Sequence, residues 1–333
     1  MNELFERVKG ALVGCAYGDA MGMPTEFMRR EDILELFPDG VDTFYASTDR
    51  DFLGRKMQAG EVTDDTINTV LIIQMLIDYK GEISSEGYLK YLQEWVKEHP
   101  EKNDVVSGPS TKRALAALEN GTPLEKAGIL GTTNGSAMKI SPIGIVSDYR
   151  DLNQLVENVY KICMPTHNNA MAIAGASAIA ACVSYCIRGG KDIEELWKLA
   201  LEAAKLGKKK GFQMTSASLE RRIQTIKKLV DTQPYDVVID ELQNLYGTGV
   251  ETIETIPSVL AVVQLANGDP TKSARISANI GADTDTIGAI STAICGAMNQ
   301  SFDSKDIELL ETVNQLNFDE LAKQLLPYIQ IIQ

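Results

Sequence analysis

Apolar residues recur at spacings of three and four along almost the whole chain, and this helical period limits the fold more than any other feature. Alternating strand patterns are nearly absent, and helix breakers such as Gly81, Pro100 and Pro234 fall between the periodic segments. No linker, low-complexity tract or repeat divides the sequence. We therefore expect an all-α protein, a single compact domain of about a dozen helices over residues 1–333.

The periodic segments predict where the helices lie. They are 65–79, 84–98, 110–119, 150–162, 169–187, 192–206, 214–231, 234–245, 256–266, 270–278, 286–298 and 304–315. Glycines 10, 14, 18 and 22 would form one stripe on a helix and let another backbone approach closely. Residues 170–187 carry no charge and reach the length of a membrane span, but their small side chains favour a buried central helix.

The charge and cysteine content narrow the set of partners. The chain has 46 acidic and 32 basic residues, a net charge of −14, so its surface repels phosphate backbones and anionic lipid. We expect neither nucleic acid nor membrane as a partner, and no segment suggests an obligatory protein partner. Five cysteines without a CxxC pair, and a start without the basic region of a signal peptide, favour a cytoplasmic protein.

Two acidic segments precede apolar helical runs, and together they predict a metal site. Taken alone, each resembles an ordinary helix cap. Their carboxylates and hydroxyls are hard ligands suited to Mg²⁺ or Mn²⁺, and two histidines in the chain exclude a histidine-rich site. Four aspartates in one site would repel each other unless two cations joined them. The candidate ligands are Thr63, Asp64, Asp65, Asp283, Asp285 and Thr286.

Five ordered motifs are spread over essentially the whole chain. They are Gly10-Ala11-Leu12-Val13-Gly14 with Gly18-Asp19-Ala20-Met21-Gly22, Thr63-Asp64-Asp65-Thr66, Asn134-Gly135-Ser136-Ala137-Met138, Thr166-His167, and Gly281-Ala282-Asp283-Thr284-Asp285-Thr286-Ile287-Gly288. Together they resemble the motifs of the ADP-ribosylglycohydrolases. Any one motif is weak, but all five in this order are highly specific. The resemblance implies an all-helical fold around two Mg²⁺ or Mn²⁺ ions held by the six candidate ligands.

The resemblance also implies roles for single residues. The catalytic candidates are Asp65, Glu26 and Asp285, with Asp285 as the bridging ligand and Asp65 or Glu26 moving the proton of a water. The candidates for holding ribose or diphosphate are Asn134, Gly135, Ser136 and His167. Asp19 is expected to bond loop amides instead. Two departures stand out: Lys139 replaces an arginine of many relatives, and no acidic residue occurs in the segment 131–133.

The implied reaction is hydrolysis of an N-glycosidic bond of an ADP-ribosyl or related ribosyl group, by attack of a metal-bound water on the anomeric carbon. The substrate is either a small molecule or an ADP-ribosylated protein. Three alternatives stay open: a hydrolase of a free nucleoside or small N-riboside, a non-catalytic binding protein, and a phosphohydrolase. The intact aspartates argue against a non-catalytic binding protein, because a protein without catalytic activity would not need a cluster of carboxylates that repel each other.

Overall fold

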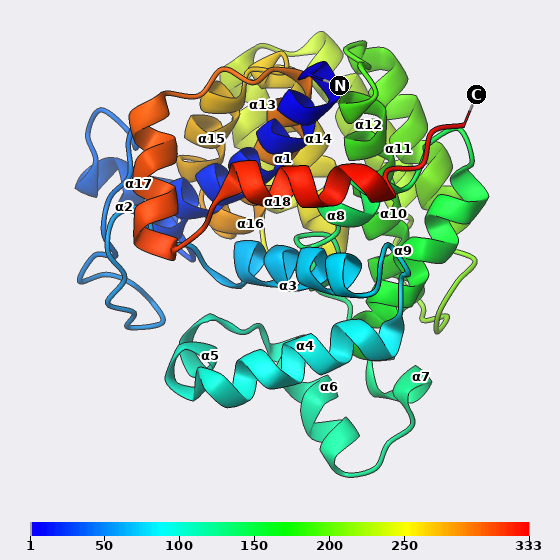
Figure 1. The fold of residues 1–333 in the computed structure, drawn as a ribbon. Coiled ribbons are helices and arrows are strands. Elements are labelled where there is room, and N and C mark those ends of the chain that lie inside the picture. The colour runs from blue at the N-terminus through cyan, green and yellow to red at the C-terminus, as the bar shows by residue number, and fades with distance from the viewer. Residues whose placement is uncertain (1, 333) are drawn as a thin grey trace.

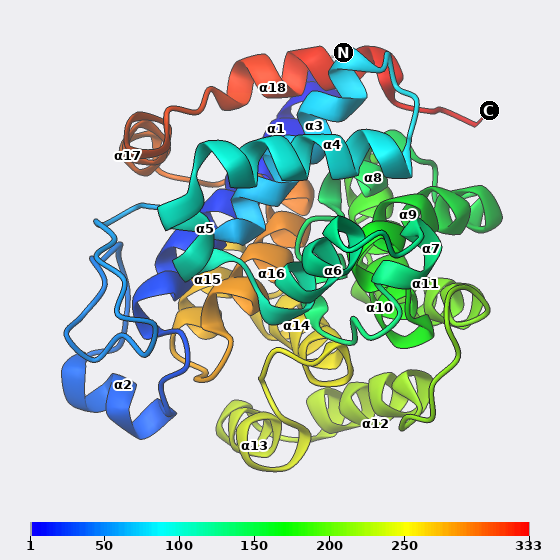
Figure 2. The same ribbon diagram turned by 90° about the horizontal axis from the view of Figure 1, so that it is seen from below.

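Two long helices, α1 (Asn2–Gly22) and α16 (Thr284–Met298), run side by side through the protein with their backbones in contact (Figures 1 and 2). The computed structural model describes residues 2–332, apart from the side chains of residues 2 and 104–106. A Cβ atom on Gly14 would lie 2.2 Å from the carbonyl oxygen of Thr292, and one on Gly18 would lie 2.0 Å from that of Gly288. The predicted glycine stripe is therefore confirmed as a helix contact.

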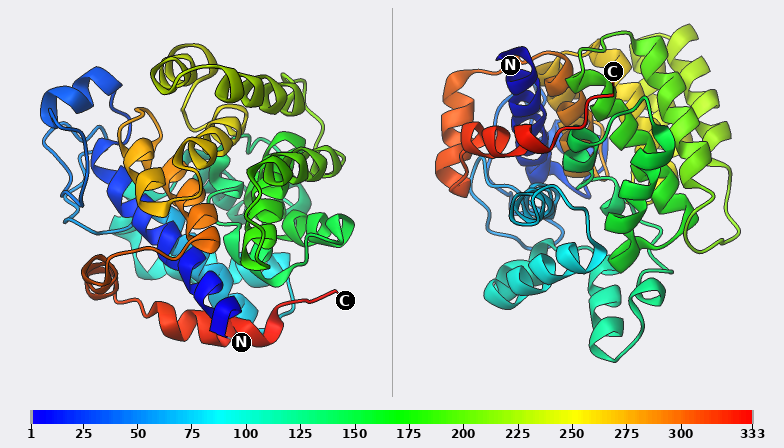
Figure 3. Two further views of the ribbon diagram at one scale, coloured as in Figure 1. Left: turned by 90° about the horizontal axis from the view of Figure 1, so that it is seen from above. Right: turned by 45° about the vertical axis from the view of Figure 1, so that its right-hand side comes forward.

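A second central helix, α10 (Ala170–Ile187), lies in the hydrophobic core beside α11 (Ile193–Gly207) and α14 (Thr252–Ala266). It is long and apolar enough to span a membrane by composition, yet all its residues except Met171 are buried inside the protein. Small side chains let its neighbours pack closely, so the expected core helix is confirmed. The two termini lie on the same side of the molecule, with α18 (Phe318–Leu325) crossing α1 nearby (Figure 3).

Shorter helices surround this centre, and no β-strand occurs between residues 2 and 332, only two isolated bridges. The helices are α2 (Arg30–Leu36), α3 (Asp64–Asp78), α4 (Ser85–Glu98), α5 (Pro100–Val106), α6 (Pro109–Glu119), α7 (Leu124–Ala127), α8 (Ser141–Val146), α9 (Leu152–His167), α12 (Leu219–Thr232), α13 (Tyr235–Glu241), α15 (Pro270–Ala278) and α17 (Ser304–Asn314). Four short turns join them: η1 (Met23–Thr25), η2 (Asn134–Ser136), η3 (Leu242–Tyr246) and η4 (Leu326–Tyr328). The all-α prediction is confirmed.

Some helix boundaries differ from those that the apolar period predicted. The helix expected from residue 214 begins only at Leu219, because Ser218 caps it by accepting from the amide of Arg221 at 3.2 Å. The helix expected to end at residue 162 continues to His167 through Pro165, since packing outweighs the missing amide. The short helices α2, α5, α7 and α8 were not predicted, because seven or fewer residues show too little apolar period.

We expect the substitution Gly14→Ala to lower the free energy of unfolding by about 1–3 kcal/mol, because the added methyl group meets backbone atoms of α16. Alanine would otherwise stabilise a helix by up to about 1 kcal/mol over glycine, so the sign is diagnostic. Urea unfolding followed by circular dichroism measures it. The control is Gly108→Ala, whose Cβ would meet nothing within 4 Å. A Gly14→Ala protein as stable as this control would contradict the close contact.

Candidate active site

The two acidic segments meet at the starts of α3 and α16. Asp64 and Asp65 form the first turn of α3, Asp283 precedes α16, and Asp285 lies in its first turn. The hydroxyl of Thr286 donates to Oδ2 of Asp65 at 3.3 Å, although 221 positions separate the two residues. The segments therefore converge in space, as the sequence led us to expect, while metal ligation by their residues stays a prediction.

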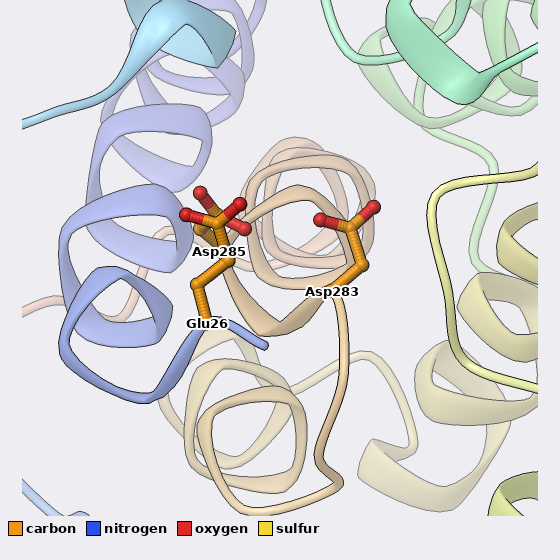
Figure 4. Close-up of side chains that lie close together, drawn as sticks. All are labelled: Glu26, Asp283 and Asp285. Carbon is orange, nitrogen blue, oxygen red and sulfur yellow. The ribbon is translucent and has the colours of Figure 1, made fainter. Parts of the chain in front are cut away.

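Glu26, just after η1, completes the acidic cluster. One carboxylate oxygen from each of Glu26, Asp283 and Asp285 lies within 4.8 Å of the others, and all three side chains are buried. Figure 4 shows the carboxylates of Glu26 and Asp285 next to each other and that of Asp283 beside them. Oxygen atoms so closely grouped match the ligand set that a divalent cation such as Mg²⁺ or Mn²⁺ takes.

A buried arginine from the loop before α3 fixes Glu26. The guanidinium of Arg55 forms an ion pair with Glu26 and a second one with Asp51 at 2.8 Å, and it donates to the carbonyl of Met23 at 3.1 Å. The side chain of Arg55 is only 2% exposed. The sequence did not reveal Arg55, because it stands in an irregular loop and belongs to none of the five motifs.

Asp65 supplies the observation that best tests whether a cation fits. Its Oδ2 accepts from the hydroxyls of Thr63 at 3.2 Å and Thr286 at 3.3 Å. Its Oδ1 is buried and has no hydrogen-bond partner. A buried carboxylate oxygen without a partner is costly, and a cation would remove that cost. The residues present therefore fit a metal centre.

Burial and mutual repulsion also raise the pKa values of these acids. The pKa of Asp64 rises to about 7, first through its removal from water and then through the charge of Asp285. The pKa values of Asp65 and Asp283 are raised for the same two reasons. Burial and Asp285 also raise the pKa of Glu26, although the charge of Arg55 opposes them. The cluster thus takes up protons near neutral pH unless positive charge compensates it.

Asp19 on α1 orients the start of α3. Its Oδ2 accepts from the amides of Thr63 at 3.1 Å and Thr66 at 3.0 Å, and from the Thr66 hydroxyl at 2.5 Å. The expectation that Asp19 bonds loop amides is confirmed. Burial, followed by repulsion from Asp285, raises the pKa of Asp19 to about 7.

The acidic cluster lines a pocket of about 150 Å³ that is partly open to solvent. The apolar side of the pocket consists of Phe27, Leu53 and Val250. The segment around the start of α6 contributes Ser107, Gly108, Pro109, Thr111 and Lys112. The region of η2 and the end of α9 contributes Thr133, Asn134, Gly135, Met138 and His167.

Three of the four predicted substrate residues line this pocket. Asn134 supports a predicted ligand, because its amide group donates to the carboxylate of Asp283 and to the Thr255 hydroxyl. Gly135 lies against the ring of His167, where a Cβ would come within 2.8 Å of the ring. Ser136 is not among the pocket walls: its hydroxyl donates to the carbonyl of Ala172 at 3.0 Å.

Comparisons with known proteins agree with the fold and show the family. Residues 1–330 match the ADP-ribosylglycohydrolase family, so the chain belongs to this family and is a hydrolase of that kind. It is 34% identical over 332 residues to the uncharacterized protein YegU of Escherichia coli (strain K12), covering 98% of each chain. It is 24% identical over 339 residues to the ADP-ribosylarginine hydrolase Tri1 of Serratia proteamaculans (strain 568), covering 97% of this chain and 80% of that protein.

A solved structure shows the same architecture. The chain superposes on an "ADP-ribosylglycohydrolase-related protein complex" with a TM-score of 0.68 over 98% of both chains, at 19% sequence identity. At that identity the likeness establishes the fold alone.

The raised pKa values predict how pH affects the metal-free protein. Asp19 and Asp64 keep their protons to about pH 7 when folded, whereas unfolded aspartates release them near about pH 4. The folded state therefore binds more protons in this window, and its stability falls as pH rises through it. In EDTA, we expect the melting temperature to decrease from pH 5 to pH 8, and added Mg²⁺ or Mn²⁺ to restore it at pH 8.

Thermal unfolding over a pH series checks this expectation. The variant Asp64→Asn should flatten the slope, and Asp39→Asn, which removes an exposed carboxylate, should leave it unchanged. A melting temperature in EDTA that rises steadily between pH 5 and pH 8 would show that the cluster carries no such repulsion.

Proposed function

We propose that this protein is a metal-dependent glycohydrolase that cleaves the N-glycosidic bond between an ADP-ribosyl, or related ribosyl, group and its leaving group. The observation that carries the proposal is the buried acidic cluster with an unpaired oxygen on Asp65, which lines a pocket that is partly open to solvent. Family membership supports the glycosidic bond over the phosphohydrolase alternative. The named relative Tri1 supports an ADP-ribosyl substrate, free or linked to a protein.

Two Mg²⁺ or Mn²⁺ ions are the proposed cofactors, held by Thr63, Asp64, Asp65, Asp283, Asp285 and Thr286. When bound, they would supply a water of lowered pKa and a fixed place for ribose hydroxyls. Asp285 is the proposed bridging ligand, since its charge acts on the pKa values of Asp64, Asp65 and Asp283 alike. Asn134 would keep Asp283 in place by donating to its carboxylate.

The protein's own residues would do the rest. Asp65 or Glu26 accepts the proton of the attacking water, and Arg55 holds Glu26 at the edge of the cluster. The negative charge of the cluster stabilises the positive charge that develops on the ribose ring as the glycosidic bond breaks. Asn134, Gly135 and His167 form one wall beside the cluster, where they would contact the ribose or diphosphate portion.

An aromatic pair at the pocket favours a second candidate, the hydrolysis of a free nucleoside or small N-riboside. Phe27 lines the pocket and is 42% exposed, and its ring centre lies 5.6 Å from that of Phe52, which is 78% exposed. Exposed phenylalanines of this kind offer a face on which a planar base can stack. This pair suits an aromatic leaving group better than an aliphatic one.

A substrate panel distinguishes the candidates. ADP-ribosylated arginine and serine peptides, ADP-ribose esters and free nucleosides are each incubated with Mg²⁺ or Mn²⁺. We expect metal-dependent release of ADP-ribose from at least one ADP-ribosyl substrate, abolished by EDTA. Turnover of nucleosides alone would favour the second candidate, and Phe27→Ala should then impair it. Hydrolysis of phosphate esters without cleavage of any glycosidic bond would contradict both.

We expect Asp285→Asn to abolish turnover while leaving the helical circular dichroism signal intact. The substitution keeps the shape of the side chain and removes the charge that we assign to the bridging ligand. In EDTA the variant should melt at the same or a higher temperature than the parent, because repulsion in the cluster falls. Asp39→Asn is the matched control and should retain full activity. Turnover by Asp285→Asn near the parent level would rule out the assigned role.

A further inference from the structure

Lys139 is a fully buried lysine directly behind the pocket wall. Its side chain has no exposed surface, its Nζ donates to the Thr166 hydroxyl at 3.3 Å, and it lies 5.1 Å from the centre of the Tyr88 ring. Burying an ammonium group is costly, and the hydrogen bond, the aromatic face and the negative charges of Asp64 and Asp65 offset part of that cost. Lys139 thus places a positive charge next to the Thr166 hydroxyl.

A continuous chain of hydrogen bonds leads from Lys139 to the pocket. The Thr166 oxygen also contacts Nδ1 of His167 at 2.8 Å. On the other side of the ring, Nε2 of His167 contacts the Thr133 oxygen at 3.0 Å. The Thr133 hydroxyl in turn donates to the Ser110 oxygen at 3.0 Å. Both ring nitrogens of His167 thus have protein partners, so the ring meets the pocket through its carbon atoms.

The number of protons available determines which group donates in each of these hydrogen bonds. Each hydroxyl has one proton, and a neutral imidazole has one N–H. Thr133 gives its proton to Ser110, so it must accept the proton of His167 at Nε2. Nδ1 is then an acceptor and takes the proton of Thr166. Thr166 can therefore only accept from its third partner, and a protonated Lys139 can only donate.

The ring of His167 is fully buried, and hydrogen bonds at both of its nitrogens hold its orientation. Burial also lowers the pKa of His167 and keeps the ring neutral.

We propose that Lys139 is a positioning residue: through Thr166 it fixes the Nε2–H tautomer of His167, which orients Thr133 at the pocket wall. The ammonium charge polarises the Thr166 hydroxyl toward Nδ1 and disfavours a proton on that nitrogen. Without this charge the two orientations of the hydroxyls become closer in energy, and the tautomers can mix. Lys139 lies behind a wall of the proposed active site, and the property that it controls is which nitrogen of His167 carries the proton. A test of this property therefore does not depend on which substrate the enzyme cleaves.

The test is long-range ¹H–¹⁵N correlation spectroscopy of the ¹⁵N-histidine-labelled protein at neutral pH. The chain has only two histidines, so His99→Gln assigns both spectra. We expect His167 to show a protonated Nε2 and an unprotonated Nδ1, with the full separation of the two nitrogen shifts. A parent spectrum with the proton on Nδ1, or with both nitrogens protonated, would overturn the proposal without any further variant.

Two substitutions of Lys139 then isolate its contribution. Lys139→Met removes the donor and keeps an unbranched chain, so the separation of the nitrogen shifts should shrink as the tautomers mix. Lys139→Arg restores an obligate donor and should restore the separation. A folded Lys139→Met protein with an unchanged Nε2–H spectrum would show that Lys139 does not set the tautomer.

Discussion

The backbone contact between α1 and α16 places every other part of the site. Because glycines on both helices remove the side chains between them, the helix ends approach within contact distance. Gly22 at the end of α1 leaves no room for a Cβ, which would lie 2.4 Å from the carbonyl of Thr284. The segment that follows α1 therefore brings Glu26 next to Asp285. Asp19 on α1 lies next to the start of α3 and accepts from the amide of Thr66 there.

Such close assembly concentrates negative charge, and the protein compensates it only partly. Arg55 neutralises one side of the cluster and is itself shared between Glu26 and Asp51. Hydroxyl and amide donors reach one oxygen each of Asp65, Asp283 and Asp285, and the other oxygen of Asp65 is buried without a partner. Without a cation the site therefore holds uncompensated negative charge, which supports the cation-binding role that we propose for it. The excess of negative charge in the cluster is the feature of the fold on which the metal-dependent chemistry proposed for this member of the ADP-ribosylglycohydrolase family depends.

The parts predicted from sequence are those with a local signal. The helical period gave the fold class, the four-residue glycine spacing gave a close helix contact, and the acidic residues before two apolar runs gave the paired helix starts. Tertiary contacts gave no such signal. Arg55 reaches Glu26 from an irregular loop, and Asn134 turned out to support Asp283 across 149 positions of sequence. Ser136 belongs to the same motif as Asn134, but its hydroxyl donates to the carbonyl of Ala172, a contact that the motif alone does not indicate.

The central claim is that the cluster exists to bind two cations. Anomalous diffraction from Mn²⁺-soaked crystals tests it most directly, because it locates each ion without reference to activity. The account predicts two peaks, roughly 4 Å apart, between the side chains of Asp64 and Asp65 on one side and Asp283 and Asp285 on the other. Full soaking that leaves this cluster without an anomalous peak would contradict the account.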